Sequence, residues 1–234
     1  MKLFVIIFTI TLIVAVLPGS SIGQSTVEKL HVPADFENII KFAPPGWKVE
    51  EPVPGDLNGD GVSDYAIKLV ESKTGANDNG DPIEKQRALV IVFGTSDGQL
   101  TRAAVNNKLL QCTRCGGAFY GVVESPANVK IEKGVLVIDQ DHGSRNLTNT
   151  TYRFRYDPAS QKFVLIGFDF SDADRATAGV VSESTNYSTG LRIVTRSQGA
   201  RDIRSRTQIP KTKVYLEQVD SEQYEAAAAK RLRL

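Results

Sequence analysis

The chain has 234 residues, of which 41% are hydrophobic and 24% charged, a balance typical of a globular protein with one good core or two small ones. Its 28 basic and 27 acidic residues almost cancel. Such neutrality argues against nucleic acid as the main partner, because a phosphate backbone demands a strong basic excess.

The first 23 residues are predicted to be a secretory signal peptide. Lys2 supplies the positive start, residues 3–17 form an apolar stretch, and Ser21-Ile22-Gly23 is a small-residue cleavage site. A bilayer span needs about 20 apolar residues, so the stretch is short for one, although an uncleaved anchor stays open. No later segment is apolar for long enough to cross a membrane. We expect an exported protein, periplasmic or extracellular, with no membrane span after signal removal.

Residues 24–34 are expected to be a flexible leader, and a single β-rich domain is expected to cover residues 35–219. The domain begins with a short amphipathic helix over residues 35–42, since apolar residues recur there at helical spacing. Pro44-Pro45-Gly46 ends that helix, and an extended segment follows.

The next segment, residues 55–64, spaces oxygen-bearing residues as a calcium loop does. The expected ligands are the side chains of Asp56, Asn58, Asp60 and Asp64 and the main-chain carbonyl of Val62. Gly61 permits the sharp turn that directs them inward. Three carboxylates that converge without a cation repel one another, which favours an occupied calcium loop over a plain Asn/Gly/Asp turn. An EF-hand fits less well, because Ile67 stands where its bidentate Glu is needed.

This loop resembles those of FG-GAP and VCBS-type repeats, in which a Gly-Asp-x-Asn-x-Asp-Gly-x-x-Asp loop leads into a strand. In those repeats a second strand ends near Phe-Gly, and here Ala88 to Gly94 occupies that place. The resemblance implies a calcium-binding β-hairpin over residues 55–94. A single copy argues against a whole seven-bladed propeller.

The rest of the pattern is mostly β. Apolar, β-branched runs separated by turn residues predict strands at 65–70, 88–93, 128–132, 134–139, 151–156, 162–167, 178–182, 191–195 and 213–218. The clearest hairpin joins the strands at 151–156 and 162–167, because Tyr152, Phe154 and Tyr156 share one face. We expect a mainly β fold of antiparallel sheets and hairpins. The Asn/Asp-rich stretch 74–82 is typical of a solvated loop, with a second cation as the alternative.

Cys112 and Cys115 are the only cysteines. In an oxidising compartment a local disulfide is the default, contributing about 2 kcal/mol in the chain-entropy model. Two alternatives stay open. A thioredoxin-like redox motif needs a helix that Gly116-Gly117 would break, and zinc needs two more ligands where the only histidines are His31 and His142.

Gly94-Thr95-Ser96-Asp97-Gly98 matches the Gly-x-Ser-x-Gly nucleophile elbow of serine hydrolases. If residues 100–110 formed the required helix, Ser96 with His142 and either Asp139 or Asp141 would be the available triad. The alternating βα units of that fold are missing, and the last two residues of the motif suit a hairpin turn. The hairpin is therefore the favoured interpretation, and a small secreted hydrolase is the alternative.

Residues 192–213 carry a local excess of six positive charges in an otherwise neutral chain. The charged residues are Arg192, Arg196, Arg201, Asp202, Arg204, Arg206, Lys211 and Lys213. This basic segment is the candidate surface for an acidic polysaccharide, a membrane surface or a partner protein, with a solvated strand face and loop as the alternative.

Residues 220–230 are predicted to form a short C-terminal helix with Asp220 as its N-cap, and the basic end, residues 230–234, is expected to fray.

Beyond the loop, the chain resembles a family of small exported bacterial proteins of unknown activity. The motifs that carry the resemblance are Pro45-Gly46-Trp47, Gly55 to Asp64, Cys115-Gly116-Gly117, Thr151 to Tyr156, Leu165-Ile166-Gly167 and Asn186-Tyr187-Ser188-Thr189-Gly190. The resemblance implies export and a calcium-loop β architecture. We expect a binding or envelope-interaction module without catalysis.

Overall fold

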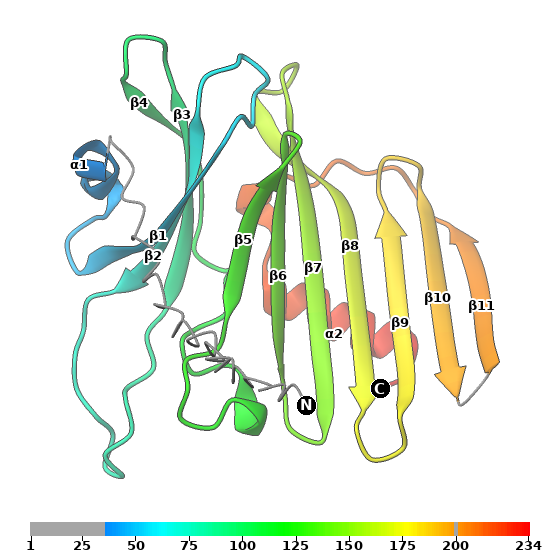
Figure 1. Ribbon diagram of the computed structural model, residues 1–234. Coiled ribbons are helices and arrows are strands. Elements are labelled where there is room, and N and C mark those ends of the chain that lie inside the picture. The colour runs from blue at the N-terminus through cyan, green and yellow to red at the C-terminus, as the bar shows by residue number, and fades with distance from the viewer. Residues whose placement is uncertain (1–35, 199–200) are drawn as a thin grey trace, which may run out of the picture. The chain divides into compact units, whose positions relative to one another are not determined.

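The computed structural model describes residues 36–198 and 201–234, all within one compact unit of residues 34–234. The expected signal peptide (1–23) and leader (24–34) lie outside the described residues. The fold is mainly β, with antiparallel sheets of four and seven strands and two short helices (Figure 1), so the predicted fold class is confirmed.

The four-stranded sheet has the order β1-β2-β3-β4. Its strands are Trp47–Gly55, Asp64–Glu71, Arg87–Gly94 and Leu100–Asn106. The two central strands are mostly apolar because both faces of this sheet are covered, and the buried Lys68 in β2 forms an ion pair with Glu51. Ile67 and Val90 pack against Ile39 in the predicted N-terminal helix, which forms as α1 (Phe36–Ile39) and the 3₁₀ turn η1 (Ile40–Phe42).

The seven-stranded sheet is a meander in which each strand pairs with the next along the chain (Figure 1). Its strands are β5 (Ala127–Glu132), β6 (Val135–Gly143), β7 (Asn146–Asp157), β8 (Lys162–Asp174), β9 (Gly179–Asn186), β10 (Leu191–Gln198) and β11 (Arg201–Gln208). The predicted hairpin is confirmed as β7 and β8, with Tyr156 opposite Phe163. Tyr152 and Phe154 are buried in the core, as their shared face predicts.

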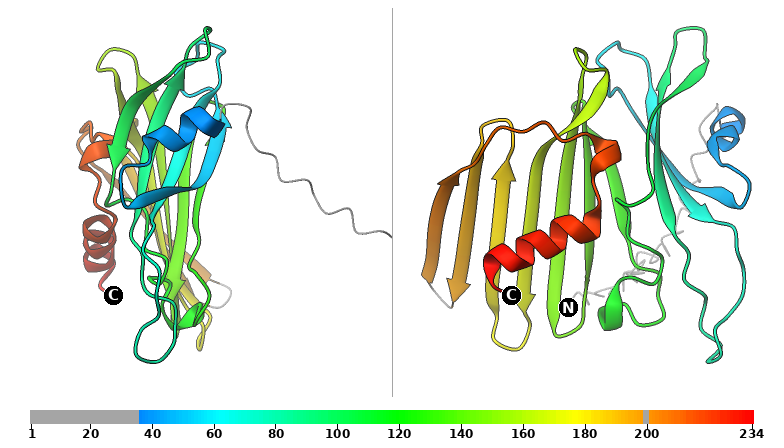
Figure 2. Two further views of the ribbon diagram at one scale, coloured as in Figure 1. Left: turned by 90° about the vertical axis from the view of Figure 1, so that its left-hand side faces the viewer. Right: turned by 180° about the vertical axis from the view of Figure 1, so that it is seen from behind.

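The main core lies between the inner face of this sheet, the four-stranded sheet and helix α2 (Ser221–Leu232). Figure 2 shows α2 crossing one face of the seven-stranded sheet, where Ala228 and Leu232 are buried. Asp220 caps the helix by accepting the N–H of Gln223 at 3.3 Å, as predicted. The predicted fraying of residues 230–234 is wrong, because the helix continues to Leu232 and Arg231 forms an ion pair with Glu183.

One other expectation fails, and one strand is not predicted. The strand predicted at 213–218 is a single bridge at Tyr215 followed by the 3₁₀ turn η3 (Leu216–Gln218). Side-chain hydrogen bonds from Asn106 to the carbonyls of Leu216 and Val219, at 2.6 and 2.8 Å, hold that turn. The basic segment also contains a strand, β11, that the sequence does not predict. It has too few apolar residues to show the apolar alternation by which strands are recognised.

Among residues 36–198 and 201–234, no helix is long and apolar enough to cross a membrane.

Candidate metal site

The predicted calcium loop connects β1 to β2 and is closed by the pair Gly55–Asp64. Gly59 and Gly61 have φ angles of +83° and +81°, a conformation that favours glycine. Gly61 therefore makes the sharp turn that its position predicts. Gly94, at the end of β3, comes so close that an added Cβ would lie 2.3 Å from the carbonyl oxygen of Ser63, so only glycine fits there.

The side-chain oxygens of the loop are directed inward and accept hydrogen bonds from its own main chain. Asp56 Oδ1 and Oδ2 accept the N–H groups of Gly59 and Gly61 at 2.7 and 3.0 Å. Asn58 Oδ1 accepts the N–H of Asp60 at 2.9 Å, and Asp60 Oδ1 accepts that of Val62 at 2.8 Å. These local bonds are typical of Asx turns, and they hold the loop in its shape.

Asp64 is fully buried and joins the loop to the neighbouring hairpin. Its Oδ2 accepts the N–H groups of Leu57 and Asn58 at 2.8 and 3.3 Å, and its Oδ1 accepts the N–H of Gly94 at 3.0 Å. Burial raises the pKa of this carboxyl group, the three main-chain hydrogen bonds lower it, and the charge of Asp60 raises it further. Asp64 thus carries a desolvated charge next to a second carboxylate.

The donor set fits a hard cation in its chemistry, since carboxylate, amide and carbonyl oxygens are the ligands that calcium prefers. A carboxylate has about four lone-pair sites, so Asp56 and Asp60, which each accept two hydrogen bonds, keep about two free. Asp64 accepts three and keeps about one. Within the described chain, the carboxylates of the loop do not form a cluster of three with all their ligand atoms within 4.8 Å.

Ser96 lies exposed in the hairpin loop between β3 and β4, and the segment after it is a strand, not a helix. Gly98 has a φ of +79°, which confirms the hairpin-turn interpretation. Among the described residues, Ser96 makes no hydrogen bond to His142, whose Nε2 lies 2.6 Å from Glu225 Oε1 on α2. The strand–turn–helix geometry of a nucleophile elbow is therefore absent from this segment, because residues 100–106 form the strand β4 and not the helix that the hydrolase alternative requires.

Asp139 and Asp141, the other members of the alternative triad, have different partners. Asp139 accepts a hydrogen bond from the hydroxyl of Thr151 at 2.8 Å. Asp141 accepts one from the hydroxyl of Tyr120, whose pKa is raised to about 12 by burial and by that bond.

The His142–Glu225 pair makes stability depend on pH. The hydrogen bond to Glu225 raises the pKa of His142 above 6.5, burial lowers it, and the charges of Glu225, Asp141 and Asp172 raise it further. Because the pKa is higher in the folded state, the pair stabilises the fold fully below pH 6.5 and loses that effect as the pH rises through the raised value. We expect wild-type protein to lose up to about 1 kcal/mol more unfolding free energy between pH 6 and pH 9 than Glu225→Gln does.

Chemical denaturation at a series of pH values measures this difference. Glu222→Gln removes from the same helix an exposed carboxylate that forms no ion pair with His142, so it is the matched control and should keep the wild-type slope. Equal slopes for wild type and Glu225→Gln would mean that His142 does not titrate against Glu225.

The disulfide between Cys112 and Cys115 is present, as the sequence predicts. A 3₁₀ turn, η2 (Gly117–Phe119), follows it in place of a thioredoxin-like helix. In the Asn/Asp-rich stretch, Asn77 Oδ1 accepts the N–H groups of Asn79 and Asp81 at 3.0 and 2.9 Å. That arrangement is typical of a solvated turn.

Sequence reasoning missed the charged groups that depend on long-range contacts. Arg87 is buried and binds Glu50 at 2.8 Å, and Glu183 is buried between Arg231 and Arg192. A charged residue at the start of a continuous apolar strand is the available signal for Arg87. No sequence pattern near Glu183 identifies Arg231 as its partner, because the two residues are far apart along the chain.

No protein-family model matches this chain, and neither a curated protein nor a solved structure shows significant similarity to it. The resemblance to FG-GAP and VCBS-type loops and to small exported bacterial proteins therefore stays a prediction.

Proposed function

We propose that this is an exported calcium-binding β protein that acts as a binding or envelope-interaction module without catalysis. The observation that supports calcium best is Asp64, a buried carboxylate whose pKa rises with burial and with the charge of Asp60. A divalent cation within the loop would neutralise both groups and remove that repulsion.

In this proposal the ion is held by the side chains of Asp56, Asn58, Asp60 and Asp64 and by the carbonyl of Val62. Asp56 and Asp60 each accept two hydrogen bonds and keep about two free lone-pair sites, while Asp64 also fastens the loop to Gly94. The ion supplies positive charge and cross-links the loop. Its role is structural, because the loop joins β1 to β2 and Asp64 joins it to the end of β3.

Calcium is expected to stabilise the protein by about 0.4–1.4 kcal/mol at a millimolar concentration, given a dissociation constant of about 0.1–1 mM typical of extracellular modules. A calorimetric melt in calcium and in chelator measures this gain. Asp60→Ala should abolish the difference, because it removes one of the proposed calcium ligands. Asp60 is exposed, so its loss leaves no buried group unpaired and should not itself unfold the protein. Asp78→Ala, an exposed aspartate in another loop, should keep it. An identical melt of wild-type protein in both buffers would contradict the proposal.

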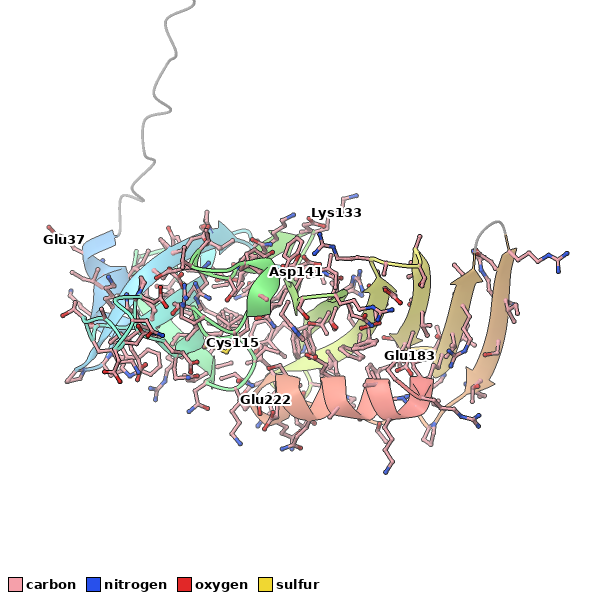
Figure 3. The ribbon with its side chains drawn as sticks, turned by 90° about the horizontal axis from the view of Figure 1, so that it is seen from below. Glu37, Cys115, Lys133, Asp141, Glu183 and Glu222 are labelled. Carbon is pink, nitrogen blue, oxygen red and sulfur yellow. A yellow bond between two sulfur atoms is a disulfide. The ribbon has the colours of Figure 1, made fainter. Side chains whose placement is uncertain are left out.

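The partner we propose is an anionic polymer, specifically an acidic polysaccharide, which docks on β11. This strand is at the edge of the seven-stranded sheet, and all its side chains are exposed. Arg192 and Arg196 are engaged with Glu183 and with the carbonyl of Leu232, and Lys213 forms an ion pair with Asp157. Most of the remaining accessible charge of the basic segment therefore lies on β11, with Lys211 exposed just after it. Figure 3 shows β11 lying beyond the end of α2, where a long chain can approach it.

Reversing two charges on this strand, Arg204→Glu with Arg206→Glu, should remove retention on a heparin-type resin at low salt. Exposed positive charges attract a polyanion through long-range forces that salt screens. The control Lys48→Glu with Lys73→Glu makes the same charge change at exposed sites outside the basic segment. Equal elution of both double variants would overturn the assignment to β11.

A further inference from the structure

The disulfide Cys112–Cys115 lies at a cavity of about 640 Å³ that also contains an acidic side chain. The two sulfur atoms and a carboxylate oxygen of Glu84 are all within 4.8 Å of one another. Glu222, at the start of α2, lines the same cavity, and Figure 3 shows Cys115 and Glu222 from below. Cys115 is exposed at this cavity and Cys112 is buried behind it, so solvent and ions reach the pair from the Cys115 side.

The segment that carries the cysteines is held in place independently of the disulfide. Thr113 is buried, its N–H donates to the carbonyl of Lys85 at 3.0 Å, and its carbonyl accepts the N–H of Ser125 at 2.9 Å. The hydroxyl of Ser125 donates to the carbonyl of Cys112 at 2.8 Å. The N–H of Cys115 donates to the same carbonyl at 3.3 Å, forming a tight turn. Both sulfurs would therefore stay on the same side of this turn after reduction.

A buried arginine fastens the flanks of the segment to the four-stranded sheet. Arg87 donates to the carbonyls of Gln111 and Ser125 at 3.2 and 2.9 Å, and Glu50 holds its guanidinium at 2.8 Å. These bonds do not involve sulfur, so reduction leaves them intact.

The same contacts position Glu84. The N–H of Lys85, the next residue, donates to the hydroxyl of Thr113 at 3.1 Å, which fixes the main chain beside the cysteines. Glu84 Oε1 accepts a hydrogen bond from Gln86 at 2.9 Å. A carboxylate has about four lone-pair sites, so Glu84 can bind a metal and keep this bond.

We propose that the reduced form of this cluster is a zinc site with Cys112, Cys115 and Glu84 as protein ligands and water as the fourth. A dithiol reductant passes two electrons and two protons to the disulfide and is itself oxidised to a disulfide. Zinc then displaces the two thiol protons into solvent and forms two Zn–S bonds and one Zn–O bond. Tetrahedral zinc with ligands at about 2.0–2.3 Å separates ligand atoms by about 3.5–3.8 Å. Once the S–S bond is broken and the sulfurs move apart, this spacing lies within the 4.8 Å that encloses the three ligand atoms.

The oxidised chain has no such site, because its sulfur atoms are bonded to each other. Zinc binding at this cavity therefore depends on the redox state of the cysteines: the reduced protein binds the ion and the oxidised protein does not. Thiolates select zinc over calcium, so this site is separate from the loop at residues 55–64.

Cobalt titration of the reduced full chain, with calcium in excess and oxygen excluded, tests the proposal. We expect one cobalt ion per chain with a thiolate-to-cobalt charge-transfer absorption, and displacement of that cobalt by zinc. The oxidised protein and the Cys112→Ser, Cys115→Ser double variant should give no such absorption. Glu84→Gln should weaken cobalt binding at least about tenfold, whereas Glu124→Gln, an exposed carboxylate of the neighbouring segment, should not.

Reduced protein that binds cobalt no better than the double-serine variant would overturn the site. Equal affinity of wild type and Glu84→Gln would overturn the role of Glu84. Circular dichroism of the reduced protein checks the scaffold, and a loss of β structure on reduction would contradict the preformed cluster.

Discussion

Replacing Asp64 by Ala is expected to lower the free energy of unfolding by about 3–5 kcal/mol, even with calcium chelated. Asp64 is fully buried, and its carboxylate accepts three main-chain N–H groups. Its removal leaves the N–H groups of Leu57 and Gly94 without their partner in a buried environment. Each buried, unsatisfied donor costs about 1–3 kcal/mol, and bonds to a charged acceptor lie toward the upper end.

Urea denaturation in chelator measures this loss without any contribution from a bound ion. Asp64→Asn should be milder, about 1–2 kcal/mol, because an amide retains one accepting oxygen. Asp78→Ala, exposed in the 74–82 loop, should change stability by less than about 0.5 kcal/mol. An Asp64→Ala protein as stable as the Asp78→Ala control would show that Asp64 does not fasten the loop to β3.

Glu183→Ala is the second substitution with a large expected effect, about 3–5 kcal/mol. Glu183 is 1% exposed and accepts hydrogen bonds from Arg231 Nε and Nη2 at 2.9 and 2.7 Å, and Arg192 Nε lies 3.4 Å from its Oε1. The pKa of Arg231 is raised chiefly by the bond to Glu183. Loss of the carboxylate leaves two arginines facing each other without a counter-charge, and breaking a buried pair in this way typically costs that amount.

Figure 3 shows Glu183 beside the C-terminal half of α2, so hydrogen exchange of that helix reports the same effect locally. We expect amide protection in α2 to fall in Glu183→Ala and to stay unchanged in Glu222→Ala, whose side chain is exposed. Retained protection with an unchanged unfolding free energy would mean that apolar burial of Leu232 alone holds the helix.

The sequence predicts an element correctly where its local pattern of apolar or capping residues fits a strand or a helix but not both. The alternation of Tyr152, Phe154 and Tyr156 identifies β7, because one face of that strand meets the core and the other does not. The Asp220 cap identifies the start of α2. These signals are local, so a single sequence contains them.

The elements that were misjudged depend on tertiary contacts. β4 (100–106) resembles a helix when its apolar residues are counted alone, yet pairing with β3 makes it a strand. β11 has little apolar character and exists because β10 offers it an edge. The turn at Leu216 ends a predicted strand because Asn106, distant in sequence, binds its carbonyl.

The site shows the same division. The spacing of the sequence identifies the loop residues and Gly61. Asn and Asp side chains hydrogen-bond to main-chain groups a few residues away, and a glycine permits the local turn, so both signals are local. Spacing does not show that Asp64 is bonded to Gly94, or that Glu84 comes within reach of Cys112 and Cys115, because in each case segments distant along the chain bring the groups together.

Metal analysis after equilibrium dialysis tests the calcium proposal most directly. With about 1 mM calcium outside, the purified protein is expected to take up about 0.5–0.9 calcium ion per chain, given a dissociation constant of about 0.1–1 mM, and Asp60→Ala is expected to take up markedly less. Wild-type protein that retains no more calcium than Asp60→Ala would contradict the proposal.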